Sequence, residues 1–282
     1  MTVYHSRTIL DGLAFPEAPR WRAGRLWFTD QHARAILAMN PAGEREMIAP
    51  TEDLPGGLGW LPDGRVLVVF MTQRRVMQLT SEGLVEYADL STQSSFHCND
   101  MVVDAAGRAY VGNFGFDLHG GEEVEPAEIV RIDQDGTVEE FAKDVVFPNG
   151  SVITPSGETL LVAETFANRV SAFGLDARGG VASRWLWADL GEHTPDGICM
   201  DAEEALWIAS PGTGTLLRVK QGGVILDRCT TRGTPYACLL GGEDRRTLYI
   251  CTSETDDPQQ AAEQKSGRIE RARVTVAGAG VP

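Results

Sequence analysis

Short apolar runs, each followed by turn residues, recur along the whole chain. Residues 45–49 (REMIA) and 169–173 (RVSAF) alternate between apolar and polar side chains. A period of two is typical of strands with one buried face, and no segment keeps the period of 3.6 that marks an amphipathic helix. The pattern therefore predicts an all-β protein.

The apolar runs are themselves organised in a longer repeat. Six similar segments each place an apolar strand residue four positions after a key residue, and these key residues are Glu17, Gly56, Asn99, Asn149, Asp196 and Tyr236. The spacings between successive key residues are 39, 43, 50, 47 and 40. A repeat of this length, made of several short strands, is typical of a β-propeller, in which each sheet buries its faces against its neighbours.

The strands of each unit follow from the same pattern. The first unit has strands at 17–22, 25–30, 34–39 and 45–50, and the fourth has them at 150–154, 159–165, 169–176 and 183–190. The last unit has only three, at 238–242, 247–253 and 267–274, and we expect residues 6–10 to supply the fourth. The sequence thus predicts a six-bladed β-propeller with four antiparallel strands per blade. The N-terminal strand closes the ring in the last blade, and residues 1–282 form a single domain.

Composition limits the kinds of partner and the cellular compartment that we expect for this protein. The 25 Lys and Arg against 40 Asp and Glu give a formal charge of −15, which argues against nucleic-acid binding. No apolar run approaches the roughly 20 residues of a membrane-spanning helix, and residues 1–10 lack the pattern of a secretion signal. The five cysteines are odd in number and lack Cys-x-x-Cys spacing. These features favour reduced thiols and a cytoplasmic protein.

The key residues carry the candidate chemistry. The first strand of every propeller blade lines the central channel, so the residues where the chain enters these strands are expected at one end of that channel. Two carboxylates, Glu17 and Asp196, and two amides, Asn99 and Asn149, would then converge. Buried oxygens of this kind need a positive partner, and a divalent cation suits them. The alternative is that these residues only form turns, as Pro-Asn-Gly at 148–150 ordinarily does.

The repeated segments resemble a known family. Together they are similar to the regucalcin, gluconolactonase and luciferin-regenerating-enzyme-like family of six-bladed propellers, also called senescence-marker-protein-like. The resemblance runs from about residue 12 to about residue 253. It is carried by FPEAPRW from Phe15, CNDMVVDAAGRAYVGNFG from Cys98, FPNGSVITPSGETLLVAET from Phe147, WADLGEHTPDGICMDAE from Trp187 and CLLGGEDRRTLYI from Cys238.

The resemblance implies an activity and a set of roles. It implies one divalent metal ion, calcium or zinc, at the channel entrance, and hydrolysis of a small-molecule lactone. Glu17, Asn149 and Asp196 match the family's metal ligands, and Asp196 also matches its proton acceptor. Asn99 matches an asparagine that contacts substrate or completes the metal shell. On this interpretation Asn149 is both a turn residue and a ligand.

One position departs from the family pattern. The sugar lactonases carry a substrate-binding arginine two residues before the substrate asparagine, whereas this chain has His97. Because histidine cannot present a permanent forked cation, the change weakens the case for a sugar-acid lactone more than the case for a lactone. We expect His97 to face the substrate pocket; the alternative is that it only packs beneath the loop at 116–128, near Phe116.

Two functions from different classes remain open. The first is a metal-dependent lactonase, and the alternative is a non-catalytic propeller that binds a divalent cation or a small ligand. The polar neighbours Asn99, His97 and Asp100 favour the enzyme. Two long insertions, 116–128 and 253–267, are expected at the same end of the channel, as lids over the site or as tolerated surface loops.

Overall fold

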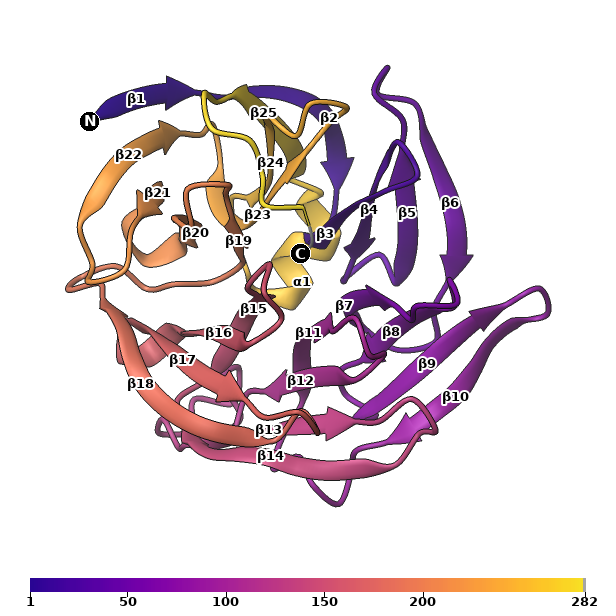
Figure 1. The fold of residues 1–282 in the computed structure, drawn as a ribbon. Coiled ribbons are helices and arrows are strands. Elements are labelled where there is room, and N and C mark those ends of the chain that lie inside the picture. The colour runs from indigo at the N-terminus through magenta and orange to yellow at the C-terminus, as the bar shows by residue number, and fades with distance from the viewer. Residues whose placement is uncertain (281–282) are drawn as a thin grey trace.

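The computed structural model describes residues 1–280, and almost all of its regular structure is strand. Six sheets are arranged around a central channel (Figure 1). Within each sheet, consecutive strands pair antiparallel from the channel outwards. The predicted six-bladed β-propeller is therefore confirmed.

The first three blades follow the repeat in chain order. Blade one contains β3 (Pro16–Arg22), β4 (Arg25–Asp30), β5 (Ala35–Met39) and β6 (Arg45–Pro50). Blade two contains β7 (Pro55–Trp60), β8 (Val66–Phe70), β9 (Arg75–Thr80) and β10 (Gly83–Asp89). Blade three contains β11 (Cys98–Val103), β12 (Ala109–Asn113), β13 (Ala127–Ile132) and β14 (Val138–Val145).

The other three blades complete the ring. Blade four contains β15 (Pro148–Ile153), β16 (Thr159–Glu164), β17 (Arg169–Leu175) and β18 (Val181–Asp189). Blade five contains β19 (Ile198–Met200), β20 (Leu206–Ser210), β21 (Thr215–Val219) and β22 (Ile225–Thr230). Blade six contains β23 (Thr234–Gly241), β24 (Thr247–Ser253) and β25 (Gly267–Arg273), with β2 (Arg7–Leu13) as its outer strand. Single-turn helices η1 (Thr165–Ala167) and η2 (Pro211–Thr213) follow β16 and β20.

The N-terminal segment closes the ring in two ways. As predicted, β2 pairs antiparallel with β25 in the last blade, in the register Arg7↔Arg271. In addition, β1 (Thr2–His5) pairs parallel with β22 and becomes a fifth strand on the outer edge of blade five. The pattern of four strands per blade did not predict this extra strand, which ties two neighbouring blades to one chain end.

The hydrophobic core lies between neighbouring blades. Strands β12 and β24 are buried along their whole length, because both faces of each sheet are covered. Tyr110 of blade three contacts Phe141 at 4.9 Å between ring centroids, and Phe141 contacts Phe173 of blade four at 5.6 Å. Fully burying a side chain of this size contributes about 1.5–3 kcal/mol to folding. All five cysteines are free and buried.

The two ends of the channel are covered by different segments. Helix α1 (Pro258–Gln264) packs its buried Ala261 against Phe15 and Tyr236, at the end where the chain enters the inner strands. Asp257 caps this helix by accepting a hydrogen bond from Gln260 N at 2.8 Å. The sequence pattern did not predict α1, because seven residues are too few to show a sustained period.

The C-terminal segment covers the opposite end of the channel. Ala202 N donates to Ala277 O at 2.8 Å, and Gly278 forms a bridge with Asp201, just beyond the end of β19. Figure 1 shows both α1 and the chain end near the middle of the ring. Within residues 1–280, no helix has the length and apolar character that crossing a membrane requires.

Candidate functional site

The inner strands carry β-bulges at their key residues. The pairing register shifts between Glu17 and Arg20 in β3, between Cys98 and Met101 in β11, and between Pro148 and Ser151 in β15. A bulge breaks the regular ladder and re-aims the side chains within it. The bulges therefore let the key residues leave the strand alternation at the channel entrance.

Close approach of blades four and five brings two of the predicted ligands together. A Cβ atom on Gly150 would lie 2.5 Å from the carbonyl oxygen of Asp196 and 2.6 Å from Ile198 N. Only glycine fits at this contact. Gly150 thus allows the strand that carries Asn149 to pass directly beside the segment that carries Asp196.

The interpretation of Asn149 as a turn residue is wrong. Asn149 and Gly150 lie inside β15, and neither has a positive φ. The positive φ of this segment belongs to Phe147, at 51°. Gly150 is required by the contact with blade five, and the positive φ falls two residues before Asn149.

The two carboxylates of the predicted site lie close enough to repel each other. Burial raises the pKa of Glu17 from 4.5 to about 8; the hydrogen bond from Ala18 N and the charge of Arg20 oppose the rise, and the charge of Asp100 adds to it. Burial also raises the pKa of Asp196 well above its ordinary value, and the charges of Glu17 and Asp100 raise it further. The entrance therefore holds concentrated negative charge that favours protons or a cation.

The amide of Asn149 is oriented by a hydrogen-bond chain. Thr165 Oγ1 donates to Pro195 O at 2.8 Å and accepts from Asn149 Nδ2 at 3.2 Å. The Asn149 side chain also forms a hydrogen bond with the Asp196 carboxyl group, which opposes the rise in the pKa of Asp196. Sequence analysis missed Thr165, because its position at the start of η1, directly after β16, gives no signal of this contact.

The amide of Asn99 is available to a ligand. Its residue is only 9% exposed, but its amide atoms are not among the fully buried side-chain atoms of residues 1–280 that lack a hydrogen-bond partner. The amide therefore keeps some contact with solvent, from which a bound molecule can reach it. Asn99 lies in β11, across the entrance from the predicted proton acceptor.

The donor set fits a hard divalent cation. Glu17 and Asp196 offer carboxylate oxygens and Asn149 offers an amide oxygen, which are the ligand types that calcium takes. Among residues 1–280, no three His, Cys, Asp or Glu side chains gather into a metal cluster. The predicted ligand set therefore has three members only if the Asn149 amide is counted. The raised pKa values of Glu17 and Asp196 are those of two buried carboxylates without a bound cation.

His97 lies beside an aromatic wall. It precedes β11, and its imidazole stacks on Phe96 at 4.1 Å and lies 6.3 Å from Phe114. Phe114 in turn stacks on Phe147 at 4.5 Å, and Phe147 contacts Phe166 at 5.0 Å. Burial lowers the pKa of His97. That His97 contacts substrate stays a prediction, but the blade-three side of the entrance is apolar and aromatic.

Both long insertions lie at this end of the channel. The insertion between Asn113 and Ala127 is anchored by Phe116, which contacts Phe147 at 5.8 Å, while its residues 119–126 are exposed. Burial lowers the pKa of His32 in blade one, and the charge of His119 in this insertion lowers it further. A lid role for this loop and for the loop containing α1 stays a prediction.

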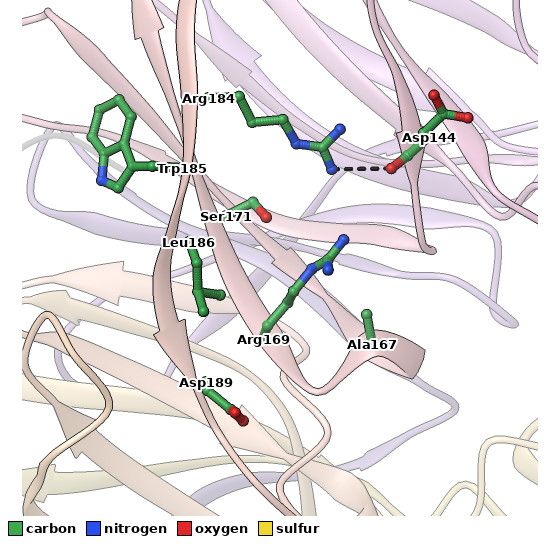
Figure 2. Close-up of a pocket in the computed structure, with 8 residues that line it drawn as sticks. All are labelled: Asp144, Ala167, Arg169, Ser171, Arg184, Trp185, Leu186 and Asp189. Atoms are coloured by element: carbon green, nitrogen blue, oxygen red, sulfur yellow. Dashed lines mark hydrogen bonds between the residues drawn. The ribbon is translucent and has the colours of Figure 1, made fainter.

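A separate cavity of about 510 Å³ lies on the outer side of blade four (Figure 2). Arg184 donates to the backbone oxygen of Asp144 at 3.0 Å. Arg169 and Arg184 also bind the buried carboxylate of Glu164, at 2.8 and 3.3 Å. These contacts join blade four to blade three, and they lie away from the channel entrance.

Known proteins share this sequence pattern and this fold. A pentonolactonase of Haloferax volcanii is 27% identical, covering 100% of this chain and 97% of its own. A 6-deoxy-6-sulfogluconolactonase of Pseudomonas putida is 28% identical, covering 94% and 93%. The crystal structure of regucalcin from Agrobacterium tumefaciens, described as a calcium-binding protein, superposes with a TM-score of 0.83 at 20% identity, covering 100% and 98%. Residues 15–254 match the SMP-30/Gluconolactonase/LRE-like region, and the chain therefore belongs to that family.

Proposed function

We propose that this protein is a divalent-metal-dependent hydrolase that opens the ester ring of small lactones. The observation that carries the proposal is the convergence of Glu17, Asn149 and Asp196, from three blades, around one electronegative space. The names of the two lactonase relatives support the reaction class. A bound cation would supply Lewis-acid polarisation of the lactone carbonyl.

Two side chains at the channel entrance have different roles in the proposed hydrolysis. Asn99 donates a hydrogen bond from its free amide to the lactone carbonyl and holds it in place. Asp196 accepts a proton from the attacking water as the bond from water oxygen to carbonyl carbon forms. The ring C–O bond then breaks, and the proton passes from Asp196 to the departing alkoxide. The product is the open-chain hydroxy acid.

The alternative is a propeller that binds a cation or small ligand without turnover. The description of the Agrobacterium regucalcin structure as calcium-binding supports this function. It explains Glu17, Asn149 and Asp196 equally well. It does not explain why Asn99, which is not needed to complete a two-carboxylate set, keeps an unpaired amide in the channel.

A panel of lactones tests the proposal. Sugar lactones, simple aliphatic lactones and aromatic lactones are incubated with the protein, with and without a chelator, and acid release is followed. We expect chelator-sensitive turnover of at least one lactone class. Tight calcium or zinc binding with no turnover across the panel would favour the non-catalytic alternative.

Substitution at His97 is expected to change substrate preference. The His97→Arg variant gains a forked permanent cation, so we expect the ratio of kcat/KM for a sugar lactone over an apolar lactone of similar ring size to rise about tenfold. The aromatic neighbours Phe96 and Phe114 support the wild-type preference for less polar substrates. A ratio that is the same in wild type, His97→Arg and His97→Ala would show that His97 does not set specificity.

The pKa of Glu17 predicts how stability depends on pH. In the metal-free protein its pKa is about 8, against an ordinary 4.5. The folded state therefore keeps a proton that the unfolded chain releases, and this stabilisation is complete below about pH 4.5 and lost as pH rises through about 8. The Glu17→Gln variant has no titratable group at this position, so it lacks this dependence on pH. We expect wild type to lose more than about 1 kcal/mol relative to Glu17→Gln over this range, in unfolding titrations with denaturant.

Parallel pH profiles of the two proteins would contradict this assignment. Metal binding should show the opposite trend in wild type. The cation competes with protons for the same carboxylates, so calcium or zinc affinity should rise as pH increases.

A further inference from the structure

A buried arginine lies directly beneath the candidate site. Arg20, on the same inner strand as Glu17, is only 6% exposed. Its guanidinium donates to Leu58 O at 3.0 Å, to Pro19 O at 3.0 Å and to Met101 O at 2.7 Å. These contacts join the inner strands of blades one, two and three. An arginine bonded in this way has one fixed position.

In the described part of the chain, the carboxylate that Arg20 binds belongs to Asp100. The Nη2 atom of Arg20 lies 2.9 Å from Asp100 Oδ1, and both side chains are largely buried, at 8% and 15% exposed. Within residues 1–280, the second oxygen of Asp100 has no hydrogen-bond partner. This oxygen is therefore free to accept a hydrogen bond from a molecule in the channel.

The backbone of Asp100 is held as firmly as its side chain. Asp100 lies in the bulge of β11, between Cys98 and Met101, beside Asn99. A Cβ on Gly57 of blade two would lie 2.2 Å from Met101 N and 2.8 Å from the carbonyl carbon of Asp100. Blade two is therefore in close contact with the backbone of Asp100, and Arg20 of blade one binds the Asp100 carboxylate.

Charge balance gives the pair a role in the site. The Asp100 charge raises the pKa of both Glu17 and Asp196, so Asp100 lies near enough to act on both carboxylates, although the three do not gather into a metal-binding cluster within residues 1–280. When all three carboxylates are ionised, as cation binding requires, their negative charges and the single positive charge of Arg20 leave a net charge of 3 − 1 = 2 negative. This net charge equals that of one divalent cation with opposite sign. Without Arg20, the site would carry an excess negative charge in a buried setting, which is costly.

We propose that Asp100 is a third carboxylate of the site and that Arg20 is the positioning residue that holds it there and offsets its charge. The proposal rests on the function proposed above and deepens it. Asp100 accepts a hydrogen bond from the attacking water or from a substrate hydroxyl through its free oxygen. Arg20 acts only through Asp100 and touches neither water nor substrate.

A double-mutant cycle tests the proposal. It uses Arg20→Gln, Asp100→Asn and the combined variant, each stripped of metal. We measure melting temperature, calcium and zinc affinity by calorimetry, and kcat and KM for a hydrolysed lactone. We expect Asp100→Asn to lower kcat about 10–100-fold and metal affinity about tenfold, with KM changed less than about threefold.

The combined variant carries the sharpest expectation. Arg20→Gln alone leaves Asp100 as an unpaired buried charge, so it should lower the melting temperature of the metal-free protein most. Adding Asp100→Asn removes that charge, and the double variant should regain stability and have a kcat no lower than that of Asp100→Asn alone. Arg20→Lys keeps the charge without the forked bonds and should fall between wild type and Arg20→Gln.

A second buried pair in blade five provides the matched control. Arg218 Nε lies 2.6 Å from Asp201 Oδ2, with side chains 8% and 0% exposed. Asp201→Asn should lower the melting temperature and leave kcat and metal affinity unchanged. The proposal is overturned if Asp100→Asn behaves like Asp201→Asn, or if the effects of the two single changes multiply in the double variant. Affinity and melting temperature are read without substrate, so a wild type that hydrolyses no lactone would reject the proposed function and leave this cycle decisive.

Discussion

Replacing Asp196 with asparagine is expected to lower kcat/KM for a lactone about a thousandfold while the ring stays folded. The substitution removes the proposed proton acceptor and one negative charge from the cation site. Calcium and zinc affinity should therefore fall by at least about tenfold in calorimetric titrations of the metal-stripped protein. The fold should survive, because the core lies between the blades and Asp196 precedes β19.

The same chemical change at an exposed turn provides the control. Asp135 lies in the turn between β13 and β14 of blade three, where it accepts a hydrogen bond from Thr137 N at 3.0 Å. This turn contains none of the residues of the candidate site. Asp135→Asn should leave turnover and metal affinity unchanged. If Asp196→Asn kept wild-type affinity and turnover, or if circular dichroism showed it unfolded while metal binding survived, the roles given to Asp196 would be wrong.

Replacing Gly150 with alanine is expected to damage stability and metal affinity together. The added Cβ would lie 2.5 Å from Asp196 O, so blades four and five must separate at the site. Overpacking of this kind costs about 1–3 kcal/mol. The separation also displaces Asn149 relative to Asp196, so we expect metal affinity to fall at least about tenfold although no ligand is changed.

Gly157 in the same blade separates this effect from ordinary backbone strain. Gly157 has a φ of +75°, and a Cβ there would meet nothing within 4 Å. Gly157→Ala should therefore lower the melting temperature through local strain and leave calcium and zinc affinity unchanged. If both variants kept full metal affinity, the close contact of blades four and five would not be what aligns the site.

The architecture could be predicted from the sequence because it repeats. The strands expected at 25–30 and 45–50 match β4 and β6, and the strand expected at 6–10 overlaps β2, which begins at Arg7. Each blade buries both faces in the same way, so the same pattern of apolar runs recurs in every unit. The length of the repeat can therefore be read from the sequence. Strand β1 breaks this rule: it pairs with β22 more than 200 residues away, and no local turn sets that register.

The candidate site could be predicted only in part. Glu17, Asn149 and Asp196 occupy equivalent positions in their units, so the repeat alone brings them to one end of the channel. The contacts that hold them are not repeated. The carboxylate partner of Arg20 lies 80 residues away, on another blade, and Thr165 contacts Asn149 from η1. The sequence predicts a turn at Asn149, which lies in a strand instead, because the close contact of Gly150 with the backbone of blade five is invisible in local sequence.

Removal and return of the metal tests the central claim most directly. A lactone that the protein hydrolyses is assayed with protein stripped by chelator, whose metal content is checked by elemental analysis, and again after calcium or zinc is added back. The account predicts that stripped protein is inactive, that one of the two ions restores turnover, and that neither restores Glu17→Gln. Full turnover by protein shown to be metal-free would contradict it.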